Sequence, residues 1–133
     1  MDTNGNTKEL LIKDLCSRLP YGVKGRVSRH DSNNRECEFV ATIDGKLYDR
    51  FAVAQESWFD NVTIKPYLFP LSSMTNEQKR EFDISMDMGY AAAYNAEINC
   101  ANRMIDFFNK YHLDYRGLIP MGLANDATGL NIY

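Results

Sequence analysis

The sequence lacks paired cysteines, long apolar runs and an excess of basic residues. Its three cysteines, Cys16, Cys37 and Cys100, are far apart and form no C-x-x-C pair. A Cys-rich zinc site is therefore not expected. No stretch approaches the ~18 consecutive apolar residues of a membrane span, and the beginning, MDTNGNTKEL, has no apolar core of signal-peptide length. These absences predict a cytoplasmic protein with reduced thiols and no membrane partner.

The charge balance and the missing motifs argue against several kinds of function. Lys and Arg number 15 and Asp and Glu number 18, so the formal net charge is -3. No overall positive field attracts nucleic acid or anionic lipid, and non-specific DNA binding depends on neutralising phosphates. The sequence contains no Gly-rich phosphate loop, no H-E-x-x-H and no G-x-S-x-G. Motifs alone therefore indicate no catalytic residue, cofactor or metal.

The length of 133 residues fits a single domain. A chain of this size buries roughly two thirds of the surface that it exposes when unfolded, which is enough for a core without disulfides or metals. The hydrophobic fraction of 44% and the charged fraction of 25% are those of an ordinary globular protein.

Hydrophobic spacing in the first half predicts a helix followed by a small sheet. Residues 1–6 are polar and expected to fray, and a helix is expected over 7–19, with Lys13, Asp14, Ser17 and Arg18 on its polar face. Its apolar stripe consists of Leu11, Ile12, Leu15, Cys16 and Leu19. Residues 22–65 alternate between apolar and polar, which indicates three or four antiparallel strands.

Three local features are expected to shape this sheet. The pair Asp44-Gly45 is a strong signal for a two-residue hairpin turn. Asp49 interrupts the alternation of its strand, which indicates a bulge or a short edge strand. Pro66 is expected to prevent the last strand from continuing as a central one.

The second half predicts two helices, with a turn and tail over 113–133. A short helix is expected over 75–82, because Thr75 and Gln78 have the spacing of a capping box. A long helix is expected over 91–112, where apolar side chains form a stripe wide enough to cover a sheet: Ile98, Ala101, Ile105, Phe108 and His112. The order of elements indicates an α+β fold, with a small curled sheet or an SH3-like barrel as its β part.

Three segments of the chain carry a resemblance: KDLCSRLPYGVKGRV (13–27), IKPYLFPLSSMT (64–75) and DFFNKYHLDYRGLIPMGLA (106–124). In this order they resemble a family of small uncharacterised proteins from gut bacteria of the Bacteroides group and from the phages that infect them. The segments cover under half of the chain, and residues 28–62 do not share the resemblance. Because that family has no assigned activity, it implies only a setting, a cytoplasmic protein associated with phages or mobile elements.

The cluster at the end of the predicted long helix has two interpretations. As a site, His112 and Asp114 offer two metal ligands, Tyr115 a hydroxyl, and Arg116 a fork for phosphate or carboxylate. As structure, a histidine in the last turn favours the helix dipole, and the residues from Asp114 to Gly117 make the turn that redirects the chain. We prefer the structural interpretation, because no third ligand lies nearby in the sequence.

A second cluster, His30-Asp31-Ser32, contains the residue types of an acid–base triad. Consecutive residues do not converge on one reacting atom, so a solvated turn is the better interpretation.

A row of cations in the predicted sheet is the candidate for nucleic-acid binding: Lys24, Arg26, Arg29 and Arg35. It lacks the interleaved aromatic residues on which bases stack, and Glu36 and Glu38 follow closely. An ordinary solvated strand face is the preferred alternative.

Aromatic residues offer a different candidate, a protein-binding surface made by Trp58, Tyr67 and Phe69. Packing of these rings into the core is the alternative. Cys16 and Cys37 are interpreted as small buried hydrophobic residues, and Cys100 has no nearby histidine to activate it.

These observations lead to three hypotheses of function. The first is a non-enzymatic interaction or regulatory module that acts on another protein. The sequence is also compatible with self-association of the chain. Its candidate surface combines Trp58, Tyr67, Phe69, His112, Asp114, Tyr115 and Arg116. The second is a nucleic-acid-binding small β-barrel that uses the row of cations. The third is a small enzyme or metal site at His112, Asp114 and Arg116.

Overall fold

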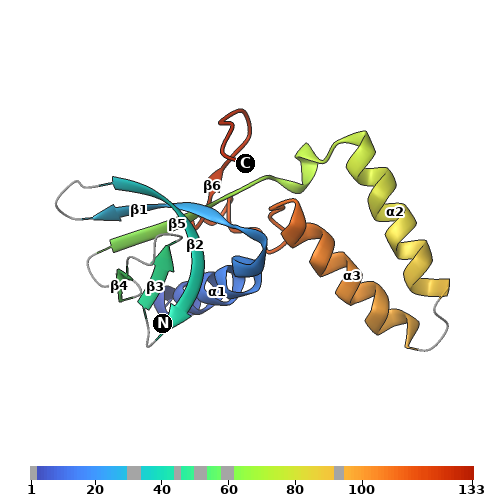
Figure 1. Ribbon diagram of the computed structural model, residues 1–133, viewed down its shortest axis with the longest axis horizontal. Helices are drawn as coiled ribbons and strands as arrows, with labels where there is room; N and C mark the ends of the chain where they lie inside the picture. Colours follow the sequence, from blue (N-terminus) through green and yellow to red (C-terminus); the bar gives the residue numbers. More distant parts are fainter. Residues whose placement is uncertain (1–2, 30–33, 44–45, 50–53, 58–61, 92–94) are drawn as a thin grey trace.

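The computed structural model describes residues 3–29, 34–43, 46–49, 54–57, 62–91 and 95–133. The fold is α+β, as predicted (Figure 1). Helix α1 (Thr3–Arg18) lies against a sheet, and helices α2 (Asn76–Ala91) and α3 (Ala96–Lys110) form a hairpin that extends away from it. Among the described helices, none has the length and apolar content needed to cross a bilayer.

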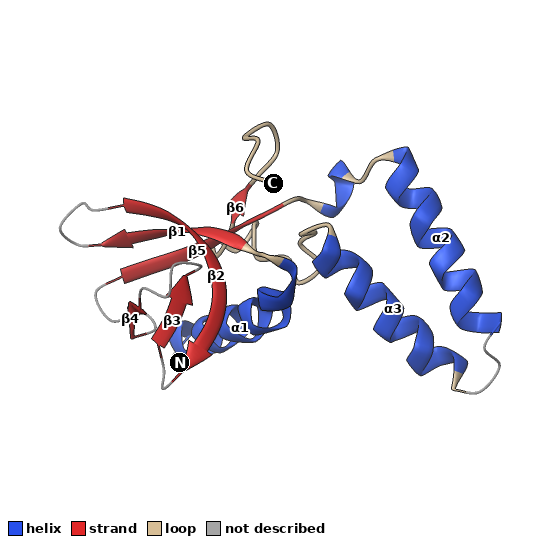
Figure 2. Cartoon of the chain, viewed as in Figure 1, coloured by secondary structure: helices blue, strands red, loops and turns tan. Residues whose placement is uncertain are grey.

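Six described strands form one sheet in the order β4-β3-β2-β1-β5-β6 (Figure 2). Neighbouring strands are antiparallel except β5 and β6, which are parallel. The strands are β1 (Lys24–Arg29), β2 (Asn34–Ile43), β3 (Lys46–Asp49), β4 (Ala54–Ser57), β5 (Val62–Leu68) and β6 (Asn125–Asp126). Two short 3-10 helices, η1 (Leu19–Tyr21) and η2 (Leu71–Ser73), flank β1 and α2.

The expectation of an SH3-like barrel is wrong, because the sheet is open. Strands β4 and β6 lie at opposite ends of the strand order, whereas closure requires the two edges to pair. Strand β6 comes from the C-terminal tail and pairs Asn125 with Tyr67. A two-residue strand has too little pattern to be recognised in a sequence, so the tail was not expected to join the sheet.

Helix α1, and not the predicted long helix, covers the sheet. Leu11 and Leu15 are buried with Val27 and Phe39 in one core, which Val23, Cys37, Ile64, Leu68, Leu118 and Ala124 complete. Gly25 makes this packing possible, since a Cβ there would lie 2.5 Å from the Phe39 ring and 2.9 Å from the Lys65 carbonyl oxygen.

The helix boundaries differ from the predictions at several points. Helix α1 begins at Thr3, so the expected frayed segment is largely helical, and it ends at Arg18. The helix predicted over 75–82 continues to Ala91. Gly89 lies inside this helix, and its missing side chain leaves room for Cys100 of α3, whose sulfur would lie 2.7 Å from a Cβ at that position.

The local predictions for the sheet are confirmed only in part. Ile43 pairs with Lys46, as a two-residue connection requires, and the turn residues 44 and 45 lie outside the described residues. The register between β2 and β3 does shift beside Asp49, but the extra residue lies in β2, between Phe39 and Ala41, and not in the strand of Asp49.

The prediction for Pro66 is wrong, because β5 continues to Leu68. Pro66 pairs with Gly25 on one side, and β6 begins only beside Tyr67. The described sheet therefore flanks Pro66 on one side alone, and a proline is tolerated where no ladder needs its missing N–H.

Candidate functional site

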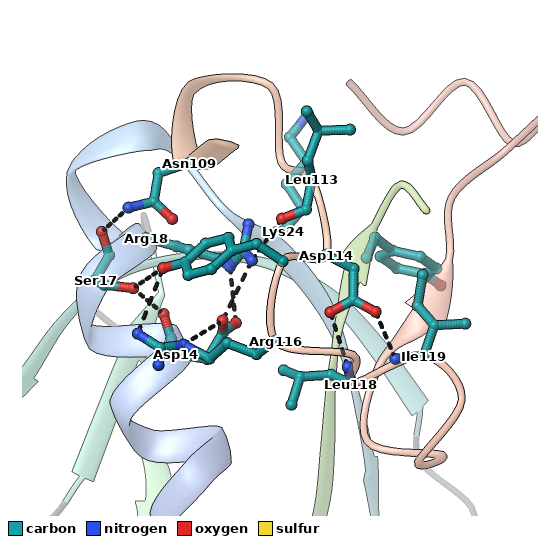
Figure 3. Close-up of polar contacts among 12 residues, drawn as sticks. Asp14, Ser17, Arg18, Lys24, Asn109, Leu113, Asp114, Arg116, Leu118 and Ile119 are labelled. Atoms are coloured by element: carbon teal, nitrogen blue, oxygen red, sulfur yellow. Dashed lines mark hydrogen bonds and ion pairs between the residues drawn. The ribbon is translucent and has the colours of Figure 1, made fainter. Parts of the chain in front are cut away.

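The cluster at His112–Arg116 lies where α1, the end of α3, β5 and the tail meet (Figure 3). Asp114 is buried, and its carboxylate accepts hydrogen bonds from the backbone N–H groups of Leu118 at 2.8 Å and Ile119 at 2.9 Å. Its own N–H donates to the carbonyl of Phe69. Both carboxylate oxygens are therefore occupied in holding the turn that redirects the chain.

His112 follows α3 with a positive φ of 56° and packs face to face on Tyr133, with the ring centroids 3.6 Å apart. Burial, reinforced by the charges of Arg18 and Lys24, lowers the pKa of His112 to about 4. The imidazole is thus neutral near pH 7, and the helix-dipole explanation, which needs a charged ring, does not hold.

Arg116 is held by a buried ion pair on α1. The Arg18 guanidinium is fully buried and donates to both oxygens of Asp14, from Nε at 2.7 Å and from Nη2 at 3.2 Å. Nη2 also donates to the carbonyl of Leu113 at 2.7 Å. Arg116 Nε adds a third contact to Asp14 at 3.1 Å. Figure 3 shows these groups converging from α1 and from the turn after α3.

Tyr115 completes the cluster between two cations. The Arg18 and Arg116 guanidinium carbons each lie 5.0 Å from the centroid of its ring, within the range of a cation–π contact. Its hydroxyl lies 3.3 Å from Ser17 Oγ, and Phe108 stacks on its ring. The tyrosine therefore helps to fasten the end of α3 to α1.

The structure thus brings His112, Asp114, Tyr115 and Arg116 together as an internal junction. The carboxylates of Asp14 and Asp114 are hydrogen-bonded through both oxygens. Three other atoms of the junction are buried without a hydrogen-bond partner among the described residues: Arg18 Nη1, Asn109 Oδ1 and His112 Nδ1. Among the described residues, no three His, Cys, Asp or Glu side chains are placed to hold a metal. This arrangement joins α1, the end of α3 and the chain that follows it.

Sequence reasoning missed the partners of this junction on α1. Asp14 and Arg18 were assigned to the polar face, but both are buried beside Leu11 and Leu15, and Cys16 is exposed instead. The available signal was the i,i+4 spacing of an acid and an arginine next to the apolar stripe. Asn109 was also missed, and it donates from α3 to the carbonyl of Ser17.

The candidate cations of the sheet do not form one row. Lys24 Nζ donates to the carbonyl of Ile132 at 2.9 Å, and Arg26 is exposed between Glu36 of β2 and Lys65 of β5. In the register, Arg35 pairs with Val27 and Arg29 with Val62, and the side chains of these two arginines lie outside what the structure describes.

Two residues of the predicted aromatic surface, Tyr67 and Phe69, lie in the described part of the chain. Tyr67 is buried and donates its hydroxyl to Glu36 at 2.8 Å. Phe69 is half-buried, with its ring 6.0 Å from that of Tyr133. Trp58 and the His30-Asp31-Ser32 cluster lie outside the described residues.

The expected stripe of the last helix exists, but it does not face the sheet. Ile98 and Ile105 are 62% and 42% exposed, and Ala101 between them is exposed as well. We call these three residues the α3 stripe. Met104 borders it and is also exposed, at 37%. The prediction that this stripe covers the sheet is wrong over these residues.

The opposite side of α3 packs on α2. Phe107 contacts Phe82 edge to face, with ring centroids 5.3 Å apart, and Cys100 lies against Gly89. At the base of the hairpin, Glu81 accepts hydrogen bonds from Tyr111 and from Lys110, the latter at 2.9 Å. These two bonds, Tyr111 first, lower the pKa of Glu81. The hairpin is therefore braced along its length while the stripe stays open.

No protein-family model, curated protein or solved structure matches this chain.

Proposed function

We propose that the chain is a non-enzymatic interaction module that binds a protein partner through the α3 stripe. One observation carries the proposal, the exposure of Ile98 at 62% and Ile105 at 42% on the same helical face. Single exposed apolar residues are common on proteins, but a continuous apolar stripe rimmed by polar residues is typical of an interaction site.

The arrangement of layers supports the same proposal. An amphipathic helix is stabilised by packing its apolar stripe against another layer. Helix α3 meets α2 through Cys100 and Phe107, on the side away from Ile98 and Ile105. A partner with an apolar helical face of its own supplies the missing layer, in the way that helices dock into apolar grooves.

The setting that we propose is cytoplasmic and associated with phages or mobile elements. It rests on the three-segment resemblance and on the lack of an apolar run in the sequence. A module of this kind acts by binding, and regulation of the bound protein is the role that we propose for it.

Site-specific photocrosslinking tests this function. A photoreactive amino acid replaces Asn102, an exposed residue beside the α3 stripe, in cells that carry the native gene. We expect a protein adduct that Ile98→Lys or Ile105→Lys abolishes. Ile84→Lys is the matched control, because Ile84 is 54% exposed on α2 of the same hairpin.

The control variant should retain the adduct. The proposal is wrong if position 102 yields no protein adduct, or if the lysines in the stripe leave the adduct unchanged. Circular dichroism of the purified variants checks that each one folds.

A further inference from the structure

We propose that the partner of the α3 stripe is the same stripe of a second copy, packed antiparallel so that the two α3 helices lie between the two α2 helices. This inference rests on the proposed function and names the partner for it. The observations behind it are the spacing of the stripe, the charges around it and the position of the sheet relative to α3.

The spacing of the stripe matches a two-helix seam. Ile98, Ala101 and Ile105 are separated by three and then four residues. These are the a and d positions of a heptad, whose side chains interlock with those of a facing helix. Phe108 has the next position of the series, but its ring packs on Phe82 and Tyr115 and so ends the exposed seam. The small Ala101 between two isoleucines gives room for a large side chain from the facing helix, so two copies of the stripe are complementary in size.

The charged residues of α3 are occupied away from the stripe. Lys110 is bound to Glu81 of α2, and Asp106 accepts a hydrogen bond from the Tyr21 hydroxyl at 3.2 Å. Arg103 lies beside Gly89 of α2. Among the described residues of α3, this leaves Glu97 in the first turn as the one charge near the stripe.

An antiparallel pairing of two copies brings no like charges together. With Ala101 facing Ile105 of the second copy, Asn102 meets Asn102 and Met104 meets Met104 across the two-fold axis. Glu97 then lies toward the end of the second α3, near Tyr111. A partner of opposite charge gains little on so neutral a surface, whereas an identical copy is not repelled.

The position of the sheet selects the antiparallel direction. Figure 1 shows α1 and the sheet at the Lys110 end of α3, with the Ala96 end projecting away from them. Antiparallel packing places the two sheets at opposite ends of the paired α3 helices, whereas parallel packing would place them side by side. Opposed helix dipoles also favour the antiparallel arrangement.

The hairpin does not need a partner to hold its two helices together. Contacts of Phe82 with Phe107 and of Glu81 with Lys110 brace α2 and α3 before any partner arrives. Association therefore does not need to order the helices, which limits its entropic cost.

Sedimentation equilibrium of the purified full chain over a concentration series tests the inference. We expect a concentration-dependent dimer. Ile98→Lys and Ile105→Lys should each raise its dissociation constant by roughly 100-fold or more, since the two-fold axis places each lysine in the seam twice. Ile84→Lys should leave the constant within about twofold, as expected for a residue outside the interface.

A second pair of variants tests the direction and register. Asn102→Asp alone should weaken the dimer, because two carboxylates then meet. Mixing Asn102→Asp with Asn102→Lys should restore association as a heterodimer. The seam is wrong if Ile98→Lys and Ile105→Lys leave the dissociation constant of the dimer unchanged. It is also wrong if the mixture of Asn102→Asp and Asn102→Lys associates no more tightly than either variant alone.

The outcomes separate the inference from the proposed function. A chain that stays monomeric at millimolar concentration, yet still forms a stripe-dependent adduct with a different protein in cells, overturns the second copy as partner and leaves the interaction function intact. A monomeric chain without any stripe-dependent adduct overturns both.

Discussion

Asp14 and Arg18 form an ion pair inside the protein, one turn apart on α1. Arg18 Nε lies 2.7 Å from Asp14 Oδ2, and both side chains are fully buried. Moving two charges out of water costs several kcal/mol per ion, and the pair offsets that cost only when both members are present. Because Arg18 also donates to the carbonyl of Leu113, the pair connects α1 to the chain after α3.

Replacing Asp14 should strongly destabilise the protein. In Asp14→Ala the buried Arg18 loses its counter-ion, and Arg116 loses its contact as well. We expect the free energy of unfolding to fall by about 3 to 5 kcal/mol, measured by urea denaturation. Lys13→Ala, one residue away and exposed, is the control and should change it by about 0.5 kcal/mol or less. A loss of about 1 kcal/mol or less in Asp14→Ala would contradict a buried pair.

The turn after α3 should depend on the acceptors of Asp114. In Asp114→Ala the N–H groups of Leu118 and Ile119 lose their partners, with an expected loss of about 3 kcal/mol in unfolding free energy. Asp114→Asn keeps one carbonyl oxygen and should lose about half as much. Equal losses in the two variants would show that the carboxylate does not act through both oxygens.

Stability should fall as the pH drops from about 6.5 to about 4 because of His112. Its pKa is about 4 in the folded chain and near 6.5 when unfolded, so the unfolded state binds the extra proton in this window. The contribution lost is about 3 kcal/mol at most, and it is fully present above pH 6.5.

The comparison that tests this is the slope of unfolding free energy against pH in wild type and in His112→Asn. Asparagine tolerates the positive φ of this position but does not titrate. We expect a shallower slope in the variant between pH 4 and 6.5. Identical slopes would place the acid sensitivity on other groups.

Close packing between α2 and α3 should depend on Gly89. A Cβ in Gly89→Ala would lie 2.7 Å from Cys100 Sγ, so the helices must separate, with an expected loss of about 1 to 3 kcal/mol. Cys100→Ala removes that sulfur and should reduce the loss when both changes are combined. Additive losses in this double-mutant cycle would show that Cys100 is not the residue displaced.

Much of the local structure was predictable because it depends on residues that are neighbours in the sequence. The capping box at the start of α2 is present, with Thr75 N–H donating to Gln78 Oε1 at 2.9 Å and Gln78 N–H donating to Thr75 Oγ1 at 3.1 Å. The hairpin between β2 and β3 and the amphipathic stripe of α3 follow from short-range pattern in the same way. Fold class followed from the order of these elements.

The turn after α3 was predicted, but its partners on α1 were not. Asp114 accepts the backbone N–H groups of Leu118 and Ile119, as a turn-forming residue does, whereas the helix-dipole role expected for His112 is wrong. The partner of Arg116, Asp14, lies about 100 residues earlier, and a charged residue next to an apolar stripe is usually assigned to solvent. The Asp14 carboxylate is buried in contact with both Arg18 and Arg116. Because Arg116 is distant in the sequence, no local pattern predicts this contact.

The sequence by itself determined the order of a helix, a sheet and two helices, the two-residue hairpin connection and the apolar stripe of α3. Only the tertiary structure decided which helix covers the sheet. Both α1 and α3 carry an apolar stripe, and the spacing of apolar residues does not show which element each stripe packs against. Helix α1 covers the sheet, because its Leu11 and Leu15 pack in the core with Phe39. The buried Asp14–Arg18 pair connects α1 to the turn after α3. Helix α3 packed on α2 through Phe107 and Cys100, which left Ile98 and Ile105 facing outward.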